Sequence, residues 1–275
     1  MWVTNPRQGL EKPVNWRHKP KSEKELRALI APVKAIVEWI RSRGALLIGV
    51  GILKGGAGKS TSALYIALYC ARVLGLRVAI VDTDNNSQSL ANWFAVHKAL
   101  GDAIPFDLYE HPVTGKDVIT LDKRVKKLRP HYDVIIVDLG GGDKETFTDL
   151  CQEGDILLMP SAPSGWETVR IQATLQTAAR AARLNIGGLA VYNFFVKCDF
   201  RTTLPMEQRE AMAVDLSGQD EDFIMPPFLH PYFDVSNAPH HIRSWEEVPK
   251  VTDLDEWGLL IRHAMVGVMQ VEAAV

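Results

Sequence analysis

A lysine and a serine stand side by side at the end of a glycine-rich stretch that could hold a phosphate chain. An apolar run over 45–53 leads into Gly55-Gly56-Ala57-Gly58-Lys59-Ser60-Thr61. Alanine and leucine then recur at helical spacing over 63–71, which predicts a helix. A turn of backbone N–H groups at a helix N-terminus suits phosphate. We expect Lys59 to reach the terminal phosphates of a nucleotide and the Ser60 hydroxyl to ligate Mg²⁺.

The stretch departs from the common phosphate-loop pattern at one position. That pattern has a glycine five residues before Gly58, whereas this chain has Leu53 there. A second lysine, Lys54, comes directly before the loop glycines. The loop therefore predicts phosphate binding but does not by itself explain Lys54.

Aspartates end two apolar runs that follow the loop. Asp82 ends the run that begins at residue 77, and Asp138 ends the run that begins at residue 132. Asp84 lies two residues after Asp82, in a polar loop. An aspartate at the end of a buried strand can hold hydrated Mg²⁺, and we assign this role to Asp138. One such aspartate is commonly a strand-end cap, but two of them behind a phosphate loop predict a nucleotide site.

The alternation of apolar runs with helical patterns predicts the fold class. Strands that are apolar throughout and alternate with helices form a parallel sheet covered on both faces. We therefore expect an α/β fold with a doubly wound, mostly parallel sheet of the P-loop NTPase type. Ligands bind such sheets at the C-terminal strand ends, where the loop, Asp84, Asp138 and Asn193 fall. The expected strands are 45–53, 77–82, 105–109, 132–138, 155–160 and 187–193, and the expected helices follow the loop to about 75, begin at about 90, and cover 117–129, 167–183 and 254–269.

Composition excludes several classes of protein. The chain has 275 residues, of which 47% are hydrophobic and 23% charged, as in ordinary globular domains. No apolar run approaches the ~18 residues of a membrane span, and the N-terminus lacks the order of a signal peptide. The three cysteines and eight histidines show no metal-ligand spacing. We expect a cytoplasmic protein with reduced thiols and no membrane partner.

The first 45 residues differ in charge from the rest of the chain. They carry a net charge of +6, whereas the remainder carries −8. A helix is expected from Ser22 to Gly44, with an apolar stripe on one face and a kink or break at Pro32. The stripe would pack on the main domain or on a partner chain, and the basic face is more simply a solvated surface.

From about residue 46 to 250 the sequence resembles the ParA/MinD family of ATPases. Lys54-Gly-Gly-Ala-Gly-Lys-Ser-Thr61 is similar to the family's deviant Walker A motif, usually KGGxGKTT. Val81-Asp82-Thr83-Asp84 resembles its switch I segment, and 132–138 resembles its Walker B strand. The segment 89–93 is similar to that of plasmid-partition members in particular, 154–161 is similar to the next strand of ParA proteins, and 199–202 resembles the family's short Asp-x-Arg-Thr segment. We divide the chain into a basic arm and amphipathic helix at 1–44 and a ParA-like ATPase domain at 45–275.

The resemblance implies an ATPase that uses ATP and Mg²⁺, forms a homodimer in the ATP state and is slow without an activator. Lys59 would contact the β- and γ-phosphates, and Thr61 the α-phosphate. Lys54 would cross the interface to the partner's phosphates, as an arginine finger does. Asp84 would position the attacking water with support from Asp82. Asn193 resembles the family's asparagine beside adenine, and a loop-capping asparagine fits its sequence position equally well.

The resemblance also implies a role in DNA partition or cargo positioning under a small ParB-like activator. Such proteins bind double-stranded DNA non-specifically, which would associate a cytoplasmic protein with the nucleoid. Arg201 matches one DNA-contacting segment, but 227–232 holds no arginine. The basic leader or the run 123–129 could replace it, since phosphate contacts need only clustered cations. Switch II departs as well: Gly140-Gly141-Gly142 predicts a looser loop.

Three alternatives fit parts of the sequence. A MinD-like switch on a membrane needs a basic amphipathic C-terminus, and no Lys or Arg follows His263. An electron-transfer ATPase like the nitrogenase iron protein needs cysteine ligands near switch II, and 139–145 has none. A monomeric P-loop kinase gives no role to Lys54. A MinD-like ATPase switch on a protein or membrane scaffold, without DNA binding, stays the main alternative.

Overall fold

The computed structural model describes most of the chain, and several sequence predictions fall outside that part. The described residues are 2–3, 32–53, 56–84, 88–111, 119–162, 165–196, 207 and 248–273. Lys54, Gly55, Arg201, the helix expected over 22–31 and the polar segment 85–87 lie outside them.

Six parallel strands and one short antiparallel strand form a single sheet in the order β1-β7-β6-β2-β5-β3-β4. The antiparallel strand β1 (Trp2–Val3) pairs with β7 at one edge. The parallel strands are β2 (Leu46–Val50), β3 (Val78–Asp82), β4 (Asp107–Glu110), β5 (Val134–Asp138), β6 (Ile156–Ser161) and β7 (Ala190–Phe195). The predicted doubly wound, mostly parallel sheet is confirmed.

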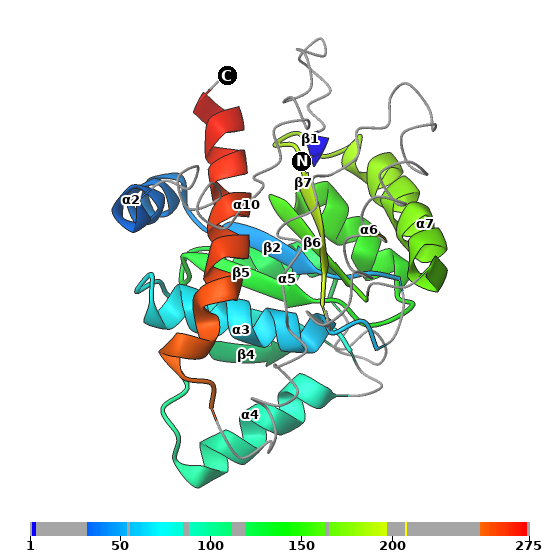
Figure 1. Ribbon diagram of the computed structural model, residues 1–275. Coiled ribbons are helices and arrows are strands. Elements are labelled where there is room, and N and C mark those ends of the chain that lie inside the picture. The colour runs from blue at the N-terminus through cyan, green and yellow to red at the C-terminus, as the bar shows by residue number, and fades with distance from the viewer. Residues whose placement is uncertain are drawn as a thin grey trace.

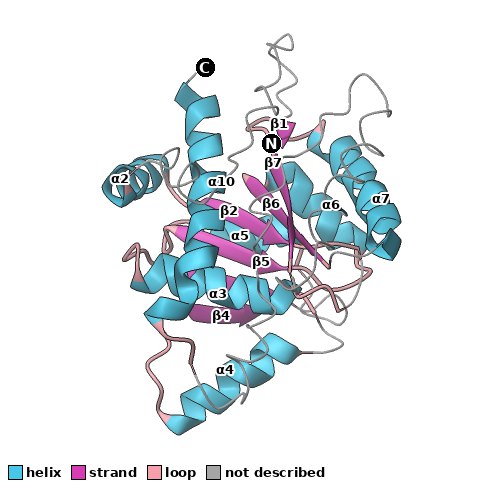
Figure 2. Ribbon diagram, viewed as in Figure 1, coloured by secondary structure: helices cyan, strands magenta, loops and turns pink. Residues whose placement is uncertain are grey.

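Helices cover both faces of this sheet (Figures 1 and 2). Ile48 and Ile136 face one layer of helices, while their neighbours Leu47 and Ile135 face the other, because side chains alternate along a strand. The first layer holds α2 (Val33–Arg43), α3 (Lys59–Arg72), α4 (Ser89–Leu100) and α10 (Asp255–Ala273). The second holds α5 (Leu121–Leu128), α6 (Lys144–Glu153) and α7 (Gly165–Ala182). A 3-10 turn, η1 (Val251–Leu254), precedes α10.

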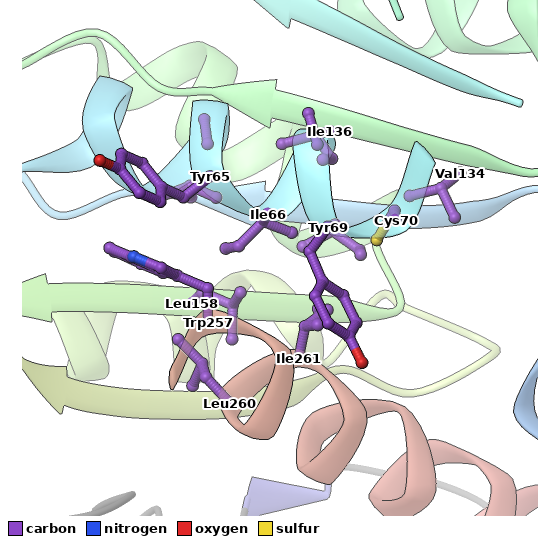
Figure 3. Packing of buried hydrophobic residues seen from close by; sticks show 14 of the residues in the cluster. Tyr65, Ile66, Tyr69, Cys70, Val134, Ile136, Leu158, Trp257, Leu260 and Ile261 are labelled. Atoms are coloured by element: carbon purple, nitrogen blue, oxygen red, sulfur yellow. The ribbon is translucent and has the colours of Figure 1, made fainter. Parts of the chain in front are cut away.

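The helix that follows the phosphate loop is buried along most of its length, because α10 packs directly on it. Figure 3 shows Tyr65 of α3 facing Trp257 of α10, with ring centroids 5.5 Å apart. Gly258 lets the two helices approach: a Cβ at this position would lie 2.2 Å from the Tyr69 ring. The carboxyl-terminal helix therefore supports the helix that carries Lys59 and Ser60.

The helix expected over 22–44 begins, in its described part, immediately after Pro32. Pro32 is extended, with φ −53° and ψ 142°, and its ring suits a position just before a helix rather than inside one. Ile36 and Ile40 are fully buried in the same core as α3 and α10. The apolar stripe thus packs on the main domain, while the boundary at residue 44 stays a prediction.

Element bounds differ from the sequence predictions at two places that matter for the site. No element was expected over 144–153, where the structure has α6; Asp143 caps it by accepting a hydrogen bond from the Thr146 N–H at 3.0 Å. The last parallel strand was expected to end at Asn193 but continues to Phe195. The prediction that Asn193 stands at a strand end is therefore wrong, because β7 pairs with β6 for two residues more.

Candidate functional site

The phosphate loop joins β2 to the first turn of α3, in the order that the sequence predicts. Gly58 immediately precedes the helix with φ +83°, a left-handed conformation that favours glycine. Its carbonyl accepts hydrogen bonds from the Ser62 N–H and hydroxyl at 2.9 and 2.7 Å, which fixes the turn. At a helix N-terminus the first N–H groups point away from the helix and suit an anion. Gly56, Ala57, Ser60 and Thr61 also lie here, with Ala57 buried and the other three at least partly exposed.

Lys59 is the first residue of α3 and is only 6% exposed. Burial lowers the pKa of its ammonium group, and the nearby carboxylates Asp138 and Asp84 act in the opposite direction. A lysine in this setting is a concentrated positive charge in a low dielectric, so it interacts strongly with phosphate.

Asp138 is the last residue of β5 and is completely buried, yet neither carboxylate oxygen is hydrogen-bonded at a favourable distance and angle. Burial raises its pKa to about 7, and the neighbouring carboxylates Asp82 and Asp84 add to that rise, while the Ser60 hydroxyl and Lys59 oppose it. A buried carboxyl group without hydrogen-bond partners needs a nearby cation to stabilise its ionised form. The orphaned oxygens beside a serine hydroxyl therefore fit magnesium, which prefers oxygen ligands.

Within the described ranges, no group of three or more His, Cys, Asp and Glu side chains could hold a metal ion. Ser60 and Asp138 supply two oxygen donors, so a magnesium ion here also needs water and the oxygens of a bound nucleotide. This ligand set is typical of a metal that arrives with its phosphate substrate.

The aspartates after β3 lie beside Asp138. Asp82, the last residue of β3, is paired in register with Asp138 of β5. Its carboxylate accepts a hydrogen bond from the Asp84 backbone N–H at 2.9 Å, and burial raises its pKa. Asp84 is half-buried and close enough to Lys59 and Asp138 to affect the pKa of both. The structure thus brings together Lys59, Ser60, Asp82, Asp84 and Asp138, as the sequence predicts.

Asn193 belongs to a different part of the sheet. It lies in β7, two strands from β2, and is completely buried. Its amide donates to the Met159 carbonyl at 2.7 Å and to the Ser161 hydroxyl at 3.1 Å, while its Oδ1 has no partner. The role of Asn193 beside an adenine stays a prediction. Val196, just after β7, lies against the loop: a Cβ on Gly58 would be 3.4 Å from its Cγ2. Sequence reasoning missed this contact, which has no local signal.

The glycines of the segment 140–142 are more constrained than the sequence suggests. A Cβ on Gly140 would lie 2.9 Å from the Thr83 carbonyl oxygen and 3.3 Å from the Asp84 Cα. Gly142 has φ +96°, just before the residue that caps α6. The Gly140 N–H donates to the Thr83 hydroxyl at 2.9 Å, so this part of the expected loose loop is fixed against the segment after β3. Thr83 was not among the predicted site residues; its only signal is its place between two aspartates.

No described helix has both the length and the apolar character needed to cross a bilayer.

Comparison with known proteins places these features in context. A family model described as ATPase MipZ matches residues 46–169, which contain the loop, Asp82, Asp84 and Asp138. No curated protein sequence matches the chain.

Three solved structures share the fold at 15% sequence identity. They are a pNOB8 ParA bound to nonspecific DNA (TM-score 0.55; 82% of this chain and 99% of that one), a Borrelia burgdorferi plasmid partition protein bound to AMPPNP (0.57; 83% and 99%), and apo McdA of Cyanthece (0.53; 82% and 98%). Nearly the whole length of each of these chains is covered, so the fold of this chain extends over a complete domain of that type.

Proposed function

We propose that this chain is a member of the ParA/MinD family of ATPases, whose MipZ model it matches over 46–169, and that it is an ATP-dependent dimerising switch for DNA partition or cargo positioning. The observation that carries the proposal is the buried, unpartnered carboxylate of Asp138 beside the phosphate loop, with Lys59 and Ser60 at the start of α3. This arrangement suits a magnesium–nucleotide complex.

ATP is the proposed substrate, with its triphosphate on the loop 54–61 and the N-terminus of α3. Lys59 neutralises the β- and γ-phosphates, and Thr61 donates its hydroxyl to the α-phosphate. Ser60 and Asp138 would hold Mg²⁺. When bound, Mg²⁺ supplies positive charge that offsets the charge developing on the transferred phosphoryl group.

Asp84 is the proposed residue that orients the attacking water. It is half-buried and near Lys59 and Asp138, so a water held by its carboxylate would lie close to the terminal phosphate. Asp82 supports Asp84 by accepting its backbone N–H at 2.9 Å. Hydrolysis to ADP removes the γ-phosphate and so changes what this end of the sheet binds.

Lys54 is the reason for proposing a dimer. The ATP-bound state would be a homodimer in which Lys54 of each subunit reaches the phosphates held by the other, and a small ParB-like protein would stimulate hydrolysis. The Lys54→Ala variant should bind ADP normally but lose ATP-dependent dimerisation, measured by sedimentation. Lys34→Ala is the matched control, because Lys34 is exposed on α2 and, among the residues that the structure describes, pairs only with Glu38, at 3.8 Å. Unchanged dimerisation and hydrolysis in Lys54→Ala would remove this role.

Non-specific double-stranded DNA is the proposed surface on which the dimer acts, so that a cytoplasmic protein would become nucleoid-associated. One structural relative is described as bound to nonspecific DNA. In addition to the predicted contact Arg201, which lies outside the described residues, we propose the exposed lysines of α5, which are Lys123, Lys126 and Lys127. Arg129 is engaged elsewhere, donating to the Ala45 carbonyl at 3.0 Å, and Lys126 lies 3.4 Å from the Asp122 carboxylate, so Lys123 and Lys127 are the cations of the run 123–129 best placed to contact phosphates.

The deciding experiment is a gel shift on non-specific duplex with ATP, ADP or no nucleotide, at low and high salt. We expect binding only with ATP, weakening steeply with salt because bound phosphates release counterions. An ATP-bound dimer without DNA affinity in low salt would overturn the DNA proposal and favour the switch on a protein scaffold. A leader deletion for this assay should end before Pro32, because Ile36 and Ile40 belong to the core.

A further inference from the structure

Two segments that carry the carboxylates of the site are joined by one buried hydroxyl. Thr83 is 2% exposed and lies between Asp82 and Asp84. Its Oγ1 donates to the Asp138 carbonyl at 3.0 Å and accepts the Gly140 N–H at 2.9 Å. Its backbone N–H donates to the same Asp138 carbonyl, also at 3.0 Å. Thr83 therefore fastens the segment after β3 to the segment after β5 on both sides of Leu139.

The fit between these segments depends on a glycine. A Cβ on Gly140 would lie 2.9 Å from the Thr83 carbonyl oxygen, which is backbone and cannot turn aside. On the other side of the segment, Leu139 is 1% exposed and packs over Gly51, just after β2. A Cβ on Gly51 would lie 2.3 Å from the Leu139 Cδ1. The segment 138–140 is thus held between the strand that leads to the phosphate loop and the segment that carries Asp84.

The two segments need a stabilising contact to stay together, because their carboxylate side chains repel one another. Asp82, Asp84 and Asp138 are carboxylates in one poorly solvated place, where like charges interact strongly. The hydrogen bonds of Thr83 are neutral and lie on the backbone side of these residues, so they persist whatever the carboxylates bind. Because these hydrogen bonds join the two segments, a movement of one segment also moves the other.

We infer that Thr83 is a positioning residue that holds the Asp84 segment against the Asp138 segment, so that the water-orienting and magnesium-holding groups respond together to the γ-phosphate. The inference rests on the proposed function. It assigns no contact with ATP to Thr83 itself, which acts through Asp84 and Gly140.

The test compares two substitutions of Thr83 in the full chain. Thr83→Val keeps the side-chain shape but removes the hydroxyl, which leaves the buried Gly140 N–H without its acceptor; Thr83→Ser keeps the hydroxyl. We expect Thr83→Val to lower kcat for ATP hydrolysis by about tenfold or more, with ADP affinity within about twofold of wild type. Thr83→Ser should recover kcat to within about threefold. The affinity for ADP reports on the phosphate loop alone, because ADP lacks the γ-phosphate to which the two segments are proposed to respond.

Two further variants separate positioning from folding. Thr148→Val is the control for loss of a threonine hydroxyl, because the Thr148 hydroxyl donates within α6, to the Lys144 carbonyl at 2.7 Å, and the variant should hydrolyse ATP like wild type. Gly140→Ala should reproduce the kcat loss of Thr83→Val by pushing the segments apart. An unchanged kcat in Thr83→Val would overturn the inference. So would equal losses of kcat, ADP affinity and stability that Thr83→Ser fails to restore, since these indicate a structural role alone.

Hydrogen exchange keeps the inference testable if the protein hydrolyses no ATP, a result that would remove the proposed activity instead. Binding of AMPPNP, compared with ADP, should slow amide exchange over 81–84 and 138–141 together in wild type. In Thr83→Val the protection should be confined to one of the two segments. Joint protection in Thr83→Val would contradict the inference.

Discussion

Asp82 and Asp138 are direct neighbours on adjacent parallel strands, each as the last residue of its strand. Fifty-six positions of sequence separate them, and both are buried, at 4% and 0% exposure. Burial raises the pKa of Asp138 to about 7, and the neighbouring Asp82 carboxylate adds to that rise. The pair is costly to the free protein, and a bound cation relieves the cost.

The first prediction concerns Asp138. Asp138→Asn should reduce ATP hydrolysis and the magnesium dependence of ATP binding by roughly 10- to 100-fold, the cost typical of losing an outer-shell metal ligand. Its stability should not fall, because the substitution removes a buried, unpartnered carboxyl group. Asp143→Asn is the matched control: Asp143 caps α6, and asparagine caps a helix equally well. Full activity in Asp138→Asn would exclude it from the metal site.

A second prediction concerns the pH dependence of stability. Burial lowers the pKa of His263 in α10 to about 4, whereas an unfolded histidine titrates near 6.5. Above pH ~6.5 the group is neutral in both states; as pH falls, the unfolded chain binds the proton first, so stability is lost between about 6.5 and 4. The free energy of unfolding, measured in urea, should therefore fall by about 2 kcal/mol less in His263→Gln than in wild type between pH 7 and 5. The exposed His131 is the control: His131→Gln should follow wild type, and identical slopes for all three proteins would refute the assignment.

A third prediction tests the support that α10 gives to α3. Gly258→Ala places a methyl group 2.2 Å from the Tyr69 ring, so the helices must separate or the ring must move, at a cost of about 1–3 kcal/mol in free energy of unfolding. Gly187→Ala is the matched control, because its nearest contact would be an ordinary 3.6 Å. Thermal or denaturant unfolding measures the stability of both variants. Equal stabilities would show that the interface between α3 and α10 accommodates the added methyl group without cost.

A fourth prediction concerns the attachment of α2. The Arg43 guanidinium lies 2.7 Å from both Asp155 and Glu272, and its side chain is 20% exposed. Arg43→Met leaves Asp155 partly buried without this partner and should cost about 1–3 kcal/mol of unfolding free energy. Lys34→Met, which removes the exposed pair with Glu38, should change stability by less than about 0.5 kcal/mol. If the two variants were equally stable, the ion pairs of α2 would contribute nothing.

Local patterns predicted the parts of the site that lie close together in the chain. The strand, the glycine turn and the helix with Lys59 and Ser60 are consecutive, so a stretch of sequence contains all the interactions that form them. The apolar runs ending in Asp82 and Asp138 likewise predicted two strand ends. The helix α6 was missed because its three buried apolar positions, Phe147, Leu150 and Cys151, follow a glycine run that suggested only a loop.

What the sequence by itself determined is therefore the fold class and the chemistry of the phosphate loop. Only the tertiary structure decided that β5 lies between β2 and β3, which places Asp138 beside Asp82 and leaves its oxygens unpartnered. The same pairing brings Thr83 to Gly140. Strand order depends on packing between residues far apart in the chain, and no local pattern encodes it, because a strand end looks the same whichever neighbour it receives.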